Sequence, residues 1–203
     1  MWNMLILASQ SPRRSELLRN AGVDFEVQAV DVDESLRPDE TPHEYVRRLA
    51  LDKAVAALKT APAGAVVLGA DTTVLVDGQG LGKPVDKDDA RRMLRLLSGR
   101  THEVITGVCV ARLDGETIVA QLESETTEVD FILMNDAEIE AYIATGEPMD
   151  KAGAYAIQGR ASRWIPRVRG CYFNVVGLPV ARTCAMLARA QLSASNREAL
   201  NRR

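Results

Sequence analysis

The sequence predicts an α/β protein, in which the strands of one sheet alternate with helices along the chain. Residues 5–8 form a short apolar run that leads directly into a helix start. An amphipathic segment at 43–59 precedes a second apolar run, Ala65–Val76. This second run is nearly continuous Val, Leu, Gly and Ala, which is typical of a strand covered on both faces. Strands of that kind, separated by helices, favour the α/β class.

The first helix is predicted to start with Ser11 as N-cap and Pro12 as its first residue. Arg13 and Arg14 then lie in the first turn, where the helix dipole already presents positive charge. Each arginine there costs about 0.3–1 kcal/mol unless an anion binds. With the side chain of Ser9 and the exposed amides, the two guanidinium groups could form a phosphate cradle. The alternative is a solvated basic helix start.

The next elements bring in an acidic loop and a lysine on an apolar helix face. Residues 25–32 alternate as a strand does and lead into an acidic group that ends at Glu34, after which the chain is polar. The helix predicted at 43–59 has one apolar stripe, and Lys53 lies on it. A lysine in that position either extends past the core into water or reaches an anion in a cleft.

Asp71 interrupts the apolar strand Ala65–Val76. A carboxylate inside such a strand must be protonated, paired or bound to a cation. The alternative is an aspartate at a strand end that accepts hydrogen bonds from backbone amides. A glycine turn follows, and Lys83 then lies between a glycine and a proline on a defined loop, where it could also be an ordinary surface lysine. The GLGKP segment lacks the spacing of a Walker A loop.

The second half of the chain is mostly predicted scaffold. The glycine-rich block at 150–179 suits a backbone that passes close to a ligand, or else a loop packed tightly against the sheet. Within it, Gln158 could offer its amide to the edge of a base. We predict, in order, a helix at 86–97, strands at 103–113 and from 117 onward, a helix that starts at an Asn135–Glu138 capping box, and a closing helix at 178–188.

Composition restricts the class of protein. The 203 residues, 46% hydrophobic, suit one domain at 1–189, or two lobes around a cleft, and we expect a frayed or disordered polar tail at 190–203. A net charge of -3 argues against a partner that is a nucleic acid polymer. The absence of an apolar run of about 20 residues argues against a membrane protein, and the N-terminus lacks the pattern of a secretory signal. We therefore expect a cytoplasmic protein.

Cysteine and histidine usage excludes several kinds of site. The three cysteines include no C-x-x-C pair, so we expect free thiols rather than disulfides or a zinc site. The two histidines, His43 and His102, are too few and too far apart for a histidine-rich metal site or a Ser-His-Asp triad.

Several short motifs follow one another at a distinctive spacing. They are Ser9-x-Ser11-Pro12-Arg13-Arg14, Glu34, Lys53, Ala70-Asp71-Thr72, Gly82-Lys83-Pro84, residues 150–155 with Gln158-Gly159, and residues 174–179. In this order they resemble the motifs of the Maf family of nucleotide pyrophosphatases. The resemblance covers residues 5–187, and the ordered series is far more specific than any single motif.

The resemblance implies a fold like that of the inosine triphosphate pyrophosphatases, with an elongated mixed sheet, flanking helices and two lobes around a deep cleft. It also implies hydrolysis of a nucleoside triphosphate to the monophosphate and pyrophosphate with a divalent cation, which would be Mg²⁺, Mn²⁺ or Co²⁺. Asp71 would accept the proton of the attacking water and share the cation with Glu34. Phosphate oxygens would be held by Ser9, Arg14, Lys53 and Lys83.

Three positions distinguish two branches of that family. Members that act on dTTP and UTP carry Arg after Ser-Pro, Thr after Asp and Gln in the late loop, which correspond here to Arg13, Thr72 and Gln158. The branch that acts on 7-methyl-GTP carries an aromatic residue, Gln and Glu instead. The resemblance therefore implies a dTTP/UTP pyrophosphatase, with modified pyrimidine nucleotides as further substrates to test. The alternatives are a pyrophosphatase for 7-methyl-GTP or another nucleotide and a non-catalytic, nucleotide-binding regulator of septum formation. A homodimer is left open.

Overall fold

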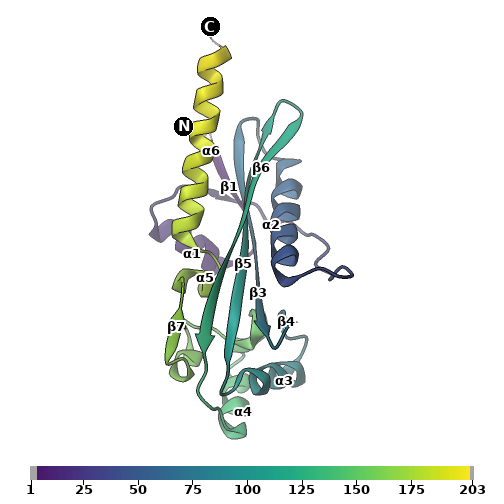
Figure 1. The fold of residues 1–203 in the computed structure, drawn as a ribbon, viewed down its shortest axis with the longest axis vertical. Coiled ribbons are helices and arrows are strands. Elements are labelled where there is room, and N and C mark those ends of the chain that lie inside the picture. Colours follow the sequence, from purple (N-terminus) through teal and green to yellow (C-terminus); the bar gives the residue numbers. More distant parts are fainter. Residues whose placement is uncertain (1–3, 202–203) are drawn as a thin grey trace. The chain divides into compact units, whose positions relative to one another are not determined.

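The computed structural model describes residues 4–201, and their side chains as far as residue 191. Helices and strands alternate around one mixed seven-stranded sheet, which confirms the predicted α/β class (Figure 1). The strands lie in the order β2-β1-β3-β5-β6-β7, and β4 pairs with β3. Their bounds are β1 Met4–Ala8, β2 Glu26–Val27, β3 Ala65–Val76, β4 Gln79–Leu81, β5 Thr101–Asp114, β6 Thr117–Asp130 and β7 Arg167–Arg169.

Six α-helices and three short 3₁₀ helices complete the part of the chain that is described. The α-helices are α1 Pro12–Asn20, α2 Pro42–Leu58, α3 Lys87–Leu97, α4 Asp136–Ala144, α5 Tyr172–Val176 and α6 Val180–Asn201. The 3₁₀ helices are η1 Glu147–Asp150, η2 Ala152–Ala154 and η3 Arg160–Trp164. Within residues 4–201, none of the helices combines the length and apolar character that a membrane span requires.

The chain divides into two compact units, in agreement with the predicted two lobes. The first unit comprises the described parts of Met1–Asp71, Gly107–Ser124 and Gly177–Arg203. The second comprises Thr72–Thr106 and Glu125–Val176. The long strands β3, β5 and β6 each contribute residues to both units.

In the first unit, α2 packs very closely against the sheet. A Cβ atom at Gly69 in β3 would lie 2.1 Å from the carbonyl oxygen of Ala50, and one at Gly107 in β5 would lie 2.3 Å from that of Val46. Only glycine therefore fits at these two positions. A stripe of small residues on the helix, which includes Ala50 and Ala54, packs on Val67 in the apolar core. This close approach determines which side chains of α2 can reach β3.

The second unit has its own core. The apolar faces of α3 and α4 are buried, with Leu94 and Ile139 at most 1% exposed. A cluster of edge-to-face rings joins His102, Phe131 and Tyr155 at centroid distances of 4.9–5.3 Å. Buried aromatic rings in this geometry stabilise the packing beyond the apolar area that they bury.

Most predicted elements are confirmed within one or two residues, and two are corrected. The strand predicted at 25–32 is only Glu26–Val27, because Val27 pairs with Leu7 and its partner β1 ends one residue later, at Ala8. The closing helix, predicted to end at 188, continues to Asn201. Its sequence from Val180 onward contains no glycine or proline that would stop it. That residues 190–203 fray in solution stays a prediction.

Candidate active site

The turn after β1 is held by side chains that the sequence predicted to bind phosphate. Ser9 and Arg14 are both buried. The Ser9 Oγ accepts hydrogen bonds from the backbone N–H of Ser11 at 3.1 Å and from Arg14 Nη1 at 3.2 Å. The Nε of Arg14 donates to the carbonyl of Gly177 at 2.8 Å. The guanidinium therefore has a defined position at the start of α1.

This turn is electrostatically prepared for an anion. Ser11 is the N-cap of α1, but its side chain makes no capping hydrogen bond, and no acidic residue lies in the first turn. Burial is the largest effect on Arg14 and lowers its pKa; Arg13 acts in the same direction, whereas Asp71 and Glu34 raise it. A bound anion would relieve the cost of a buried cation at a helix N-terminus.

Lys53 joins two carboxylates. Its Nζ lies 2.6 Å from Asp71 Oδ1 and 2.7 Å from Glu34 Oε1. The side chains of Lys53 and Asp71 are each 12% exposed, and that of Glu34 is 55% exposed. Both alternatives raised by the sequence are thereby decided, because Lys53 does not extend into water and Asp71 is paired with a cation. The Gly69 contact explains this pairing, since it lets α2 approach the strand that carries Asp71.

The carboxylates of Asp71 and Glu34 are also the candidate ligands for a divalent cation. Both converge on one positive charge, the Lys53 ammonium. Two carboxylates supplemented by water and phosphate oxygens are a donor set that suits a hard cation such as Mg²⁺. Among residues 4–201 there is no group of three or more His, Cys, Asp or Glu side chains arranged to hold a metal ion. If Asp71 and Glu34 held a cation, its remaining ligands would be water and phosphate oxygens.

Thr72 belongs to the second unit and to a separate hydrogen-bond network. Its Oγ1 lies 2.9 Å from Thr106 Oγ1, which in turn is 3.3 Å from the carbonyl oxygen of Asn174. The fully buried Asn174 donates from Nδ2 to Val104 O at 2.9 Å and to Thr127 Oγ1 at 3.0 Å. The sequence identified Asn174 only as part of a motif. Its supporting role for Thr72 becomes visible only in the fold.

Lys83 and Gln158 are exposed, and both lie outside strands and α-helices in the second unit. The amide of Gly153 donates to Gly82 O at 3.0 Å and so fixes the loop just before Lys83. Gly153 has φ +68°, and a Cβ there would lie 2.9 Å from Val74 Cγ2. Glycine is therefore required at that position. This agrees with the second interpretation of residues 150–179, a loop packed tightly against the sheet.

The predicted site residues thus fall into two groups. The structure brings together Ser9, Arg14, Lys53, Asp71 and Glu34, all in the first unit. Thr72, Lys83 and Gln158 belong to the second unit. Arg13 belongs to the first unit, where it is half-buried beside Arg14.

Sequence reasoning missed Arg48. It lies four residues from both Glu44 and Asp52, so it resembles an ordinary surface residue of a helix. In the structure, Arg48 does pair with Asp52 at 3.5 Å, but it also binds Glu40 and the loop that carries Glu34. No local pattern pointed to that partner.

The fold and this site define an α/β protein that is suited to hold an anion beside paired carboxylates. The chain belongs to the Maf-like protein family, whose family model matches residues 4–190. This membership confirms the resemblance seen in the motifs.

Two similar proteins are the dTTP/UTP pyrophosphatases of Anaeromyxobacter dehalogenans (strain 2CP-C) and Koribacter versatilis (strain Ellin345). Each is 53% identical, over 187 and 186 residues, which is 92% of this chain and 93% and 94% of the respective relative. Among solved structures, the Staphylococcus aureus Ham1 protein is 16% identical at a TM-score of 0.49, covering 95% of this chain and 100% of its own. That structural likeness carries no functional argument.

Proposed function

We propose that this chain is a nucleoside triphosphate pyrophosphatase that hydrolyses dTTP and UTP to the monophosphate and pyrophosphate. The observation that carries the proposal is the buried Asp71–Lys53 pair next to the cationic turn of Arg14. Cleavage of a triphosphate needs a carboxylate to accept a proton and cations to neutralise the phosphates. The names of the two relatives, dTTP/UTP pyrophosphatases, support the choice of substrate.

In this proposal, Asp71 accepts a proton from the attacking water. The water oxygen forms a new bond to the α-phosphorus while the bond from this phosphorus to the oxygen that bridges it to the β-phosphate breaks. Pyrophosphate leaves with the electron pair of the broken bond. Lys53 and Arg14 stabilise the negative charge that develops on the phosphate oxygens. The remaining phosphate contacts are assigned to Ser9 and Lys83.

A divalent cation, Mg²⁺, Mn²⁺ or Co²⁺, would be held by Asp71 and Glu34. When bound, it would neutralise phosphate charge and lower the pKa of a coordinated water. Carboxylates and phosphates are both negatively charged, so the Lys53 ammonium can bind either. It can therefore leave the carboxylates when the phosphates bind.

Selection of the base is assigned to Arg13, Thr72 and Gln158. The neutral amide of Gln158 can both donate and accept, which suits the edge of an uncharged pyrimidine. A carboxylate there would favour a cationic, methylated guanine instead. Arg13 and Arg14 lie about 100° apart around α1, so the two guanidinium groups are given different roles.

The test is pyrophosphate release from a panel of nucleoside triphosphates with Mg²⁺ or Mn²⁺. We expect release with dTTP and UTP and much less with dCTP, ATP and GTP. Release with only 7-methyl-GTP or purine nucleotides would contradict the substrate assignment. Nucleotide binding without any turnover would favour the non-catalytic regulator of septum formation.

We also propose a cytoplasmic location, because the substrates are free nucleotides, and no nucleic acid polymer as partner, because the net charge is -3. Cell fractionation and binding assays with DNA and RNA test these two points. The homodimer that the sequence leaves open is tested by light scattering of the purified chain.

A further inference from the structure

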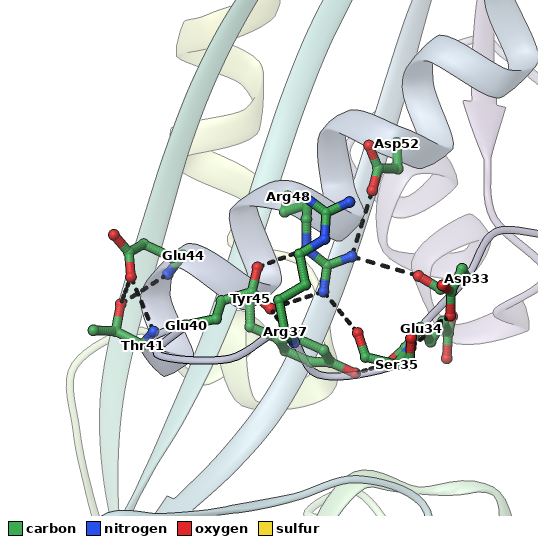
Figure 2. Close-up of polar contacts among 10 residues, drawn as sticks. All are labelled: Asp33, Glu34, Ser35, Arg37, Glu40, Thr41, Glu44, Tyr45, Arg48 and Asp52. Carbon is green, nitrogen blue, oxygen red and sulfur yellow. Dashed lines mark hydrogen bonds and ion pairs between the residues drawn. The ribbon is translucent and has the colours of Figure 1, made fainter.

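The segment that carries Glu34 has almost no regular structure to hold it. Between β2 and α2, residues 28–41 include neither a strand nor a helix. Its position is set by side chains of α2, which Figure 2 shows reaching out to the loop. The Glu34 carboxylate on this loop lies 2.7 Å from Lys53 Nζ. How the loop is held therefore decides where that carboxylate lies.

Arg48 makes the largest number of these contacts. Its Nε and Nη2 donate to the two carboxylate oxygens of Glu40 at 2.6 and 2.8 Å, which is the two-pronged geometry that guanidinium groups favour. The Nη2 also donates to Ser35 O at 3.0 Å, and Nη1 donates to Asp33 O at 3.4 Å. One guanidinium thus binds the backbone on both sides of Glu34 and the end of the same loop (Figure 2).

The Arg48–Glu40 pair is sheltered from water. The two side chains are 11% and 8% exposed, unlike surface pairs such as Arg95–Asp136, at 53% and 74%. The hydrogen bond to Glu40 is the largest effect on Arg48 and raises its pKa; the same bond lowers the pKa of Glu40. Both groups are therefore charged at neutral pH. Sheltered, two-pronged pairs hold a geometry that exposed pairs do not.

Tyr45 supplies a second support from the same helix. Its hydroxyl donates to the carbonyl oxygen of Glu34 at 3.0 Å, and the Arg48 guanidinium lies 5.5 Å from the centre of its ring. Three successive carbonyls, those of residues 33, 34 and 35, are consequently bound by two side chains of α2. The same helix supplies Lys53, which meets the Glu34 carboxylate.

We propose that Arg48 is a positioning residue that, through its pair with Glu40 and its bonds to the loop backbone, holds the Glu34 carboxylate at the reaction site. This inference rests on the proposed function, because it assigns Glu34 a part in the hydrolysis. The hydrogen bonds and ion pairs of Arg48 go to Glu40, Asp52 and the backbone on both sides of Glu34, so we expect its effect on turnover to pass through Glu34.

The first test is a double-mutant cycle of Arg48→Met and Glu34→Gln, measured as kcat and KM for dTTP at saturating Mg²⁺. We expect Arg48→Met to lower kcat about tenfold in the wild-type background and less than about twofold in the Glu34→Gln background, because coupled residues are not additive. Arg47→Met is the matched control, since it removes the same charge from an exposed neighbour on α2. Equal losses in both backgrounds would overturn the proposal, as would a loss in the control of the same size.

The second test needs no substrate. Hydrogen–deuterium exchange of the amides in residues 33–37 is expected to be at least about tenfold faster in Arg48→Met than in the wild type or in Arg47→Met, because opening of the loop is no longer opposed. Unchanged exchange in this segment would overturn the proposal. If Arg48→Met fails to fold, Glu40→Gln replaces it in both tests, since it keeps the size of the side chain and removes the ion pair.

The two tests separate this inference from the proposed function. A wild-type protein that hydrolyses neither dTTP nor UTP would contradict the function, whereas the exchange experiment would still decide whether Arg48 holds the loop. If the wild type hydrolyses dTTP but Arg48→Met lowers kcat equally with and without Glu34→Gln, only the positioning role of Arg48 is contradicted.

Discussion

The two groups of site residues differ in how firmly the molecule holds them. In the first unit, Ser9, Arg14, Lys53 and Asp71 are bound to one another or to the backbone and are largely buried. In the second unit, Lys83 and Gln158 are exposed, on segments outside the strands and α-helices. Loops supported by a rigid scaffold commonly carry the residues that choose a ligand. We infer that the first group serves the reaction, whereas in the second unit Gln158 serves the choice of nucleotide and Lys83 adds a phosphate contact from an exposed loop.

Two neighbouring residues of β3 make the difference plain. Asp71 faces α2 and pairs with Lys53, whereas Thr72 bonds to Thr106 on the next strand of the sheet. Successive side chains of a strand point to opposite faces, so one step along the chain separates the proposed proton acceptor from a proposed specificity residue. Substitutions on either side of this step should therefore have different effects.

The largest effect is expected for Asp71→Asn. Loss of the carboxylate should lower kcat for dTTP about 1000-fold, within the range of a missing general base, and leave nucleotide affinity within a few-fold. Pyrophosphate release and equilibrium binding of a non-hydrolysable analogue measure the two quantities. Asp77→Asn, in the turn directly after the same strand, is the control, because this residue is exposed and asparagine tolerates its positive φ. Wild-type turnover in Asp71→Asn would show that another group accepts the proton.

A pH effect on stability should distinguish the cores of the two units. Burial lowers the pKa of His102 from 6.5 to about 4, with Asp130 opposing the shift. The unfolded chain therefore binds a proton between pH 6.5 and 4 that the folded chain does not. The contribution of neutral His102 to the free energy of unfolding is therefore complete above pH 6.5. It is lost as the pH falls toward 4, and the loss amounts to about 3 kcal/mol.

Urea unfolding at pH 7 and pH 4.5 measures this change in the free energy of unfolding. In His102→Gln the change should be smaller by most of that amount, even if the variant is less stable at both pH values. His43→Gln, at an exposed histidine of the first unit, should behave as the wild type does. An identical pH dependence in His102→Gln and the wild type would contradict the assignment.

Lys53→Met comes next in size. It leaves Asp71 and Glu34 without the ammonium that lies between them and removes a cation from the proposed phosphate site. Since removing one group that stabilises developing negative charge costs about 100-fold or more in rate, we expect kcat/KM for dTTP to fall about 100-fold. Lys59→Met, at the exposed end of the same helix, should stay within twofold of the wild type. A loss confined to thermal stability would indicate that Lys53 serves only the fold.

The smallest effect, and one on selectivity, is expected for Gln158→Glu. A carboxylate at this exposed position should lower kcat/KM for dTTP about tenfold and raise it for 7-methyl-GTP, whose base carries a positive charge. The ratio of the two values is the quantity to measure, and Arg160→Gln, at the exposed start of η3, is the control. A fall in turnover with both nucleotides and no change in their ratio would place Gln158 outside base selection.

Much of the fold follows from signals that act over a few residues. The bounds of β3 agree with the predicted Ala65–Val76, and the Asn135–Glu138 capping box is present at the start of α4. A second capping box, between Thr41 and Glu44, begins α2 one residue before the predicted start. The strand at 25–32 could not be bounded in this way, because its length depends on the partner strand β1.

The local sequence was also enough to single out the unusual charges. Arginines in the first turn of α1, a lysine on an apolar stripe and an aspartate in an apolar strand each carry an energetic cost that their neighbours in the chain do not relieve. Motif order then identified the family. The sequence did not show which of these charges pair with each other. That pairing depends on the packing of α2 at Gly69 and Gly107, which brings Lys53 to Asp71. The same holds for Arg48 and Glu40, because contacts between segments arise only when the chain has folded.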